Sequence, residues 1–147
     1  MDDELIPRSY LYKKNDKTSG ELLSKFLKEK VVRYKRSYEK NNVSAANILE
    51  KTKIDEKNET QDYKLAVARV GNGSVGKAGL INIKKDILND MFYVFDFRDR
   101  FNDDALLKEK LCELINKRRG HFCNITFRVG SKSIKKSDVL GFRVEMN

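Results

Sequence analysis

Four aspartates in the middle of the chain have the residue type and the spacing that hydrolytic chemistry could use. Asp86, Asp90, Asp96 and Asp99 follow one another at spacings of four, six and three residues. A metal-dependent nuclease needs carboxylates that converge on one point, often with a lysine nearby. On a helix, Asp86 and Asp90 would share a face with only surface consequences, so the spacing favours solvated carboxylates. We predict no catalytic residue among them.

The single histidine, His121, follows Gly120 and precedes Cys123, where it could act as a general base or activate a nucleophile. A lone histidine just past a helix end is more often structural. One histidine with Cys112 and Cys123 is too small a ligand set for a zinc site. The two cysteines fall on different predicted elements, which favours buried reduced thiols over a disulfide. We therefore expect no metal, no cofactor and no enzymatic activity.

The glycine-rich segment 71–77 has the spacing G-x-x-x-x-G-K of a nucleotide-binding P-loop. In such a loop, successive backbone N–H groups surround the phosphates while the lysine reaches the terminal ones. This segment departs from the pattern, because Ala78 stands where Ser or Thr should hold Mg²⁺ and the next residues resemble a strand. We predict a flexible hairpin loop and keep open its contact with a nucleic-acid phosphate. The residues of that contact would be Gly71, Gly73, Gly76 and Lys77.

The surplus positive charge lies in two segments of the chain. Of a formal net charge of +9, residues 21–40 supply +4 and residues 121–147 supply +3. Both segments carry aromatic residues among the cations, which is typical of a surface that meets polyanions. The end of the predicted helix 102–119 adds three consecutive cations. The predicted contacts with nucleic acid or an acidic partner are Lys25, Lys28, Arg33, Lys35, Arg36, Lys117, Arg118, Arg119, Lys132, Lys135 and Lys136.

These features predict a small, basic, non-enzymatic binding protein that contacts nucleic acid, or a complex containing nucleic acid, through a cationic face. The alternative is an inhibitor or adaptor of the phage or mobile-element type, such as an anti-CRISPR protein, that acts on a nucleic-acid enzyme. A nuclease or nucleotide-binding enzyme is a third interpretation. The start Met1–Glu4 is acidic and no run of about 18 apolar residues occurs, so we expect a cytoplasmic protein without a membrane partner. For a phage or viral protein, that cytoplasm would be the host's. The oligomeric state stays open.

In the first part of the chain, apolar residues recur at helical spacing. Leu23, Leu27, Val31, Tyr34 and Tyr38 are separated by four, four, three and four residues, which predicts a basic amphipathic helix over about 19–41. An almost wholly polar stretch follows at 53–61 and is interpreted as a linker. We therefore predict an N-terminal arm over 1–61 and a compact α+β domain over 62–147.

The second part of the chain alternates between strand and helix patterns. Period-two alternation predicts strands at 63–67, 80–83 and 92–97, and a leucine stripe predicts a long helix over 102–119. Asn102 is its expected N-cap and Gly120 its expected C-terminal stop. A last hairpin would pair 122–129 with 139–146. The expected fold is α+β, a mostly antiparallel sheet of four to five strands packed with the helix 102–119, preceded by the N-terminal helix.

Overall fold

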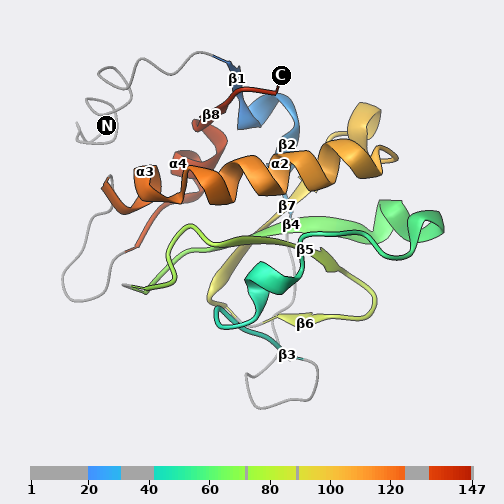
Figure 1. Ribbon diagram of the computed structural model, residues 1–147, viewed down its shortest axis with the longest axis horizontal. Helices are drawn as coiled ribbons and strands as arrows, with labels where there is room; N and C mark the ends of the chain where they lie inside the picture. The colour runs from blue at the N-terminus through green and yellow to red at the C-terminus, as the bar shows by residue number, and fades with distance from the viewer. Residues whose placement is uncertain (1–19, 31–41, 72, 89, 125–132, 147) are drawn as a thin grey trace.

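A four-stranded antiparallel sheet lies at the centre of the structure (Figure 1). The computed structural model describes residues 20–30, 42–71, 73–88, 90–124 and 133–146. The strand order across the sheet is β2 (Leu27–Glu29), β7 (Phe92–Phe97), β4 (Tyr63–Ala68) and β5 (Ala78–Asn82). The antiparallel sheet and the strands expected at 63–67, 80–83 and 92–97 are therefore confirmed, the second of them beginning two residues earlier.

Apolar side chains cover both faces of this sheet, because successive residues of β4 and β7 point to opposite faces and most residues of both sets are apolar. Leu65 and Phe95 point to one face, where they belong to a core that includes Leu111 and Ile115 of the long helix α2 (Ala105–Lys117). On the other face, a smaller cluster joins the sheet to the segments around β3 (Asn42–Val43) and β6 (Ile87–Leu88), which pair in parallel. Figure 1 shows α2 crossing above β4 and β5, with β3 and β6 below them. The members of the smaller cluster are Val43, Ile48, Ala66, Ala68, Ile81, Leu88, Phe92 and Val94.

The long helix is present but is shorter than predicted. Asp104, not Asn102, is its N-cap, and the Asp104 carboxylate accepts a hydrogen bond from the backbone N–H of Leu107 at 3.0 Å. The residues before the cap form a 3-10 turn, η4 (Asp99–Phe101), which delays the start of the helix. Asn102 has another role, because its side-chain oxygen accepts a hydrogen bond from the ammonium group of Lys108.

Residues 21–29, which were predicted to belong to the basic helix, do not form an α-helix. Residues 21–29 form β1 (Glu21–Leu22), a 3-10 turn η1 (Leu23–Lys25) and β2. Leu23 and Leu27 are fully buried, so their apolar pattern serves packing without a helix. Strand β2 gains its backbone partners from β7, a long-range pairing that local periodicity does not reveal. The rest of the predicted helix, residues 31–41, lies outside the described residues.

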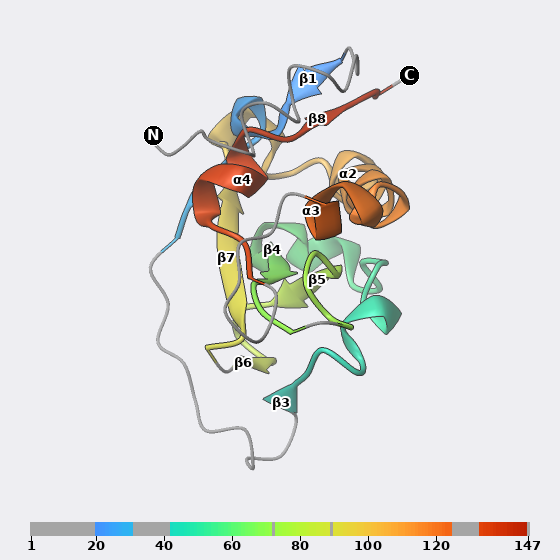
Figure 2. The same cartoon turned by 90° about the vertical axis from the view of Figure 1, so that its left-hand side faces the viewer.

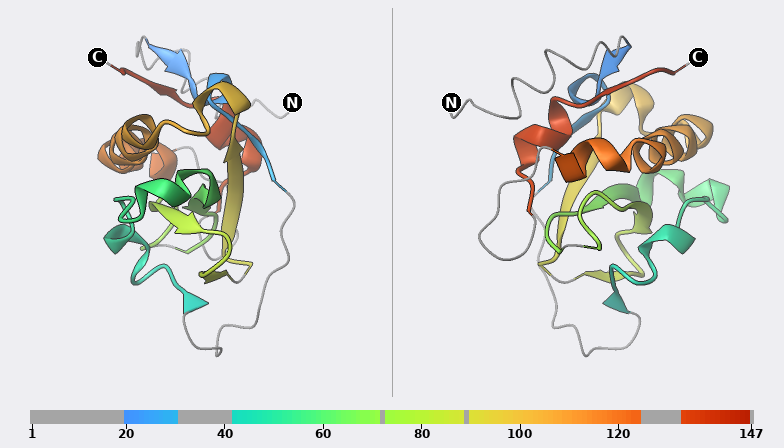
Figure 3. Two further views of the ribbon diagram at one scale, coloured as in Figure 1. Left: turned by 90° about the vertical axis from the view of Figure 1, so that its right-hand side faces the viewer. Right: turned by 60° about the vertical axis from the view of Figure 1, so that its left-hand side comes forward.

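The C-terminal hairpin prediction is wrong over its described residues. Gly120 does not end a helix in a left-handed conformation but lies in α3 (Arg119–Asn124), and residues 136–140 form α4 (Lys136–Leu140). The short β8 (Arg143–Val144) pairs with β1, and Figure 3 shows these two strands side by side. The Phe122 and Phe142 rings stack at 4.3 Å between centroids, so aromatic packing holds these elements where a hairpin was expected. Residues 125–132 lie outside the described part.

The polar stretch at 53–61 contacts the core. Ile54 is 2% exposed, and its backbone N–H donates to the Glu109 carboxylate of α2 at 2.8 Å. Two 3-10 turns, η2 (Ile48–Glu50) and η3 (Lys57–Asp62), flank this residue. Residues on both sides of the predicted boundary at 61 therefore contribute to the same buried cluster. None of the helices in the described ranges has the length and apolar character needed to cross a membrane.

Candidate polyanion-binding surface

Three of the predicted cations stand beside carboxylates. The ammonium group of Lys25 lies 2.6 Å from Glu21. Those of Lys28 and Lys136 lie 3.9 Å from Asp99 and 3.2 Å from Glu29. Such exposed pairs stabilise a fold by only about 0–1 kcal/mol. They nevertheless place a negative charge within 4 Å of each lysine, which weakens its attraction for a phosphate.

The four aspartates considered for metal chemistry do not converge. Asp96 lies 3.1 Å from Lys64 and 3.8 Å from Lys30, whereas Asp99 lies next to Lys28. The Asp96 Oδ1 atom is buried without a hydrogen bond, and its two ion pairs account for its burial. Within the described ranges, no three His, Cys, Asp or Glu side chains are grouped so as to hold a metal ion.

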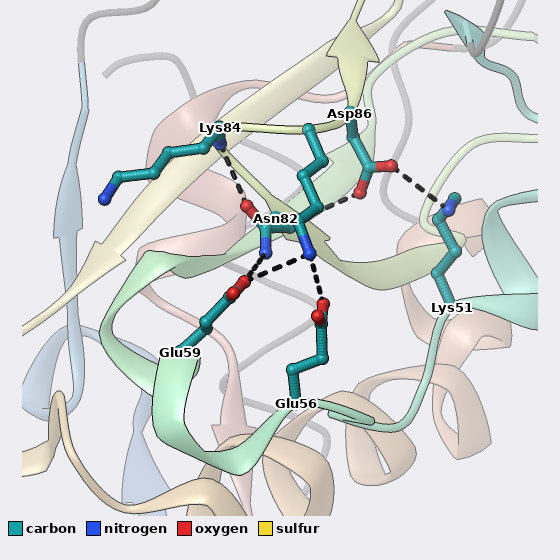
Figure 4. Close-up of polar contacts among 7 residues, drawn as sticks. Lys51, Glu56, Glu59, Asn82, Lys84 and Asp86 are labelled. Carbon is teal, nitrogen blue, oxygen red and sulfur yellow. Dashed lines mark hydrogen bonds and ion pairs between the residues drawn. The ribbon is translucent and has the colours of Figure 1, made fainter.

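Asp86 belongs to a polar network that closes the turn after β5 (Figure 4). One of its carboxylate oxygens accepts from the backbone N–H of Asn82 at 2.8 Å, and the other lies 3.3 Å from the Lys51 ammonium. The side-chain oxygen of Asn82 accepts from the N–H of Lys84 and its amide group donates to Glu59. The charged groups bond to the turn after β5 and to the segments of Lys51 and Glu59 that pack against it, so this network is structural.

Lys85 completes the same network. Its ammonium group contacts Glu56 and also lies 3.3 Å from Glu59. The hydrogen bond to Glu56 raises the pKa of Lys85 above its ordinary value. Lys51 and Lys85 of this network therefore each lie beside a carboxylate.

The glycine-rich loop uses its backbone donors internally. The N–H groups of Ser74 and Val75 both donate to the Gly71 carbonyl, at 3.2 and 3.0 Å, and that of Gly76 donates to the Ala68 carbonyl at 2.8 Å. The N–H of Lys77 donates to the carbonyl of Ser74. A P-loop keeps such donors for phosphate, so the loop offers a phosphate little beyond the Lys77 side chain and the exposed Gly73.

Two glycines of this loop have a backbone conformation that residues with a side chain rarely adopt. Gly71 and Gly76 have φ angles of +112° and +87°. A Cβ at Gly76 would also lie 3.0 Å from the Phe122 ring.

Ala78 and Leu80 face α2, so the strand alternation places Lys77 on the opposite face of the sheet.

The arginines near the end of α2 donate hydrogen bonds to backbone carbonyls. Arg118 donates to the Arg143 carbonyl at 2.8 Å, and its guanidinium lies 4.8 Å from the centre of the Phe142 ring. Arg119 donates to the Val75 carbonyl at 2.9 Å, and Arg143 donates to a carbonyl at Gly20. A carbonyl orients a guanidinium without neutralising it. Figure 2 shows α3 continuing from the end of α2.

A hollow of about 490 Å³ lies beside the same helix. It lies between the segment containing Lys53 and the last turns of α2, which end at Lys117. Both lysines are exposed, and neither has an ion pair among the residues that the structure describes. The hollow is lined by Thr52, Lys53, Glu109, Glu113, Asn116 and Lys117. We call Lys53, Lys117, Arg118, Arg119 and Arg143 the α2-end cluster.

Asn116 fixes one wall of the hollow. Its side-chain oxygen accepts from the backbone N–H of Ala78 at 2.9 Å, and its amide group donates to the Ala78 carbonyl at 3.0 Å. The side chain thereby pairs with the outer edge of β5, as a neighbouring strand would. The Leu80 N–H on the same edge donates to the Lys51 carbonyl. Helix α2 and the segment around Lys53 are therefore both anchored to the sheet.

The structure groups the predicted cations in two places. Lys117, Arg118 and Arg119 meet at the end of α2, and Arg119 packs against the loop at Gly76. Lys136 of α4 reaches Glu29 of β2, which places it near the strand of Lys28. Lys25 lies in η1, and Lys135 caps α4 through its backbone N–H. The remaining predicted cations, Arg33, Lys35, Arg36 and Lys132, lie outside the described residues.

Sequence reasoning missed two members of the α2-end cluster. Lys53 opens the polar stretch that was interpreted as a linker, and its proximity to Lys117 arises from tertiary packing. Arg143 alternates with buried Phe142 and Val144, and that alternation was the one available signal that its side chain is exposed.

No protein-family model matches the chain, and no curated protein matches its sequence.

Proposed function

We propose that the protein is a non-enzymatic binder of polyanions, and of nucleic acid in particular, that uses the α2-end cluster. The observation that carries the proposal is the contrast between two classes of cation. Lys25, Lys28 and Lys136 lie beside carboxylates, whereas Lys53 and Lys117 have no ion pair within the described ranges. Arg119 and Arg143 donate to carbonyls, which leaves their charge available to a phosphate.

The geometry suits contact with a phosphate backbone. Arginines already held by carbonyls lose less conformational entropy when they bind a phosphate than freely moving side chains would. Lys53 comes from a segment far from α2 in sequence, so the positive surface spans more than one element. Backbone contacts of this kind give affinity with little sequence selectivity.

The proposal is tested by fluorescence anisotropy with labelled DNA and RNA over a series of salt concentrations. Reversing charge in the double variant K53E/K117E should weaken binding by about tenfold or more at low salt. It should also reduce the salt dependence of binding by nearly two log units per log unit of salt, because each phosphate contact on duplex DNA contributes about 0.9.

The matched control is K25E/K136E, which changes the net charge equally at lysines that lie beside carboxylates. We expect its affinity to stay within about threefold of wild type, because the carboxylates beside Lys25 and Lys136 already offset their attraction for a phosphate. Equal losses in both double variants would show that net charge, rather than this surface, governs binding. If neither DNA nor RNA binds wild type at low salt, the proposal fails and an inhibitor or adaptor that binds a nucleic-acid enzyme becomes the better interpretation.

A further inference from the structure

The hollow beside α2 contains an acidic group as well as cations. Glu113 lines it together with Lys53 and Lys117, and Glu113 is exposed. In the part of the chain that the structure describes, no cation lies within 4 Å of the Glu113 carboxylate. A surface built only to attract phosphates would gain nothing from this carboxylate. The hollow thus presents positive and negative groups to the same ligand.

We propose that this hollow receives one unpaired nucleotide whose base carries an exocyclic amino group. Its phosphate contacts Lys53 and Lys117, and the amino group of its base donates a hydrogen bond to Glu113. This inference rests on the proposed function and adds to it a preference for single strands and for particular bases.

The size of the hollow fits this occupant. At about 490 Å³ it falls within the range of about 300–1,000 Å³ that is usual for small-molecule sites. A base inside a duplex is stacked and paired, so it cannot enter such a site without leaving the helix. Single-stranded nucleic acid presents its bases without that cost.

The chemistry of Glu113 selects among bases. An ionised carboxylate only accepts hydrogen bonds. Cytosine, adenine and guanine each offer an amino group, whereas uracil has a carbonyl oxygen where cytosine has its amino group. That oxygen and the carboxylate would repel each other, because both are acceptors.

Asn116 and Glu109, two further polar side chains of the hollow, have structural partners. Both polar atoms of the Asn116 amide are bonded to Ala78, and one oxygen of Glu109 accepts from the Ile54 N–H. Of the carboxylate and amide side chains of the hollow, Glu113 is therefore the one left to contact a base, and the substitution of Glu113 tests its part in base discrimination.

The test compares cytidine and uridine 5′-monophosphates, which differ at C4, amino or carbonyl, and at N3, a hydrogen-bond acceptor in cytosine and an N–H donor in uracil. Isothermal titration calorimetry on the full chain should show CMP binding about tenfold more tightly than UMP. Oligocytidine and oligouridine of equal length should show the same order.

The variant E113Q should lose this preference. Its amide has both a donor and an acceptor, so it can bond to either base, and the ratio of the two affinities should fall to about one. Affinity for phosphate should not fall, because a negative charge has been removed. In the variant K53A/K117A, we expect both nucleotides to bind about tenfold more weakly, while their ratio stays as in wild type. The control D90N, at an exposed aspartate of the β6–β7 turn, should behave as wild type.

Equal affinity for CMP and UMP, an undiminished preference in E113Q, or no detectable binding of CMP would each overturn the inference. These failures are distinguishable from failure of the proposed function. If K53E/K117E still weakens oligonucleotide binding while wild type shows no base preference, the surface binds phosphates and the hollow does not select a base.

Discussion

The side-chain oxygen of Asn102 lies 3.1 Å from the ammonium nitrogen of Lys108, which is completely buried. Two backbone carbonyls complete the coordination of this ammonium group, that of Thr60 at 2.7 Å and that of Tyr63 at 3.0 Å. All three of its N–H donors therefore have acceptors. The ring of Phe97, 4.8 Å away, adds a cation–π contact. Lys108 thus ties α2 to the chain that enters β4.

Replacing Lys108 with methionine keeps the length of the side chain but leaves the two carbonyls and the Asn102 oxygen without their donor. We expect K108M to lower the free energy of unfolding by about 2–4 kcal/mol, because buried polar groups without partners are costly. Urea denaturation measures this change. The same substitution at exposed Lys110, in the variant K110M, should change it by less than about 0.5 kcal/mol. A K108M protein as stable as K110M would show that the buried hydrogen bonds contribute nothing.

Burial lowers the pKa of Lys108 from 10.5 to about 8. Between these two values the unfolded chain binds this proton more tightly than the folded protein does, so the contribution of Lys108 to stability rises with pH. The unfolding free energy of wild type minus that of K108M should therefore increase between about pH 8 and pH 10.5. Urea titrations of both proteins across this range measure the difference. If this difference in unfolding free energy stays constant or falls as the pH rises, the three hydrogen bonds stabilise the charged ammonium form enough to offset the effect of burial on its pKa.

Cys112 is completely buried, and burial raises the pKa of its thiol to about 12. The thiolate is the reactive form, so the native protein should protect this residue from thiol reagents at neutral or mildly alkaline pH. In a C123A background, the Cys112 thiol should react with a disulfide reagent only as fast as the protein opens. Full and rapid reaction should appear in denaturant. Rapid modification of the native C123A protein would contradict the buried position.

The two glycine substitutions G76A and G73A should differ sharply. Gly76 has a positive φ, and an added Cβ would lie 3.0 Å from Phe122, whereas a Cβ at Gly73 meets nothing within 4 Å. We expect G76A to lower the unfolding free energy by about 1–3 kcal/mol and G73A to change it by less than about 0.5 kcal/mol. Thermal denaturation of both variants checks this. The comparison uses stability alone, because the added Cβ of G76A would also lie 3.3 Å from the Arg119 side chain of the α2-end cluster. A G76A protein as stable as G73A would contradict the packing role of Gly76.

Part of the site was predictable from local sequence. The consecutive cations Lys117, Arg118 and Arg119 follow a leucine stripe, and that pattern indicated a helix whose end would be basic. Lys53 and Glu113 could not be paired in this way, because 60 positions separate them in the chain and the hollow that they share is formed by packing. The sequence showed the spacing of four between Glu21 and Lys25, but the pairs of Lys28 with Asp99 and of Lys136 with Glu29 join distant segments and could not be predicted.

Local periodicity determined the central strands and α2, because alternation and the spacing of leucines report directly which side of an element is buried. It failed at Leu23 and Leu27, whose helical spacing is equally satisfied by a strand–turn–strand segment buried under the core. There the pairing of β2 with β7 decided the structure, through hydrogen bonds to residues almost 70 positions away. The same holds for the charges. Composition set the surplus of cations, but only the tertiary structure decided which of them meet a carboxylate and which remain available to a ligand, because that depends on distances across the folded surface.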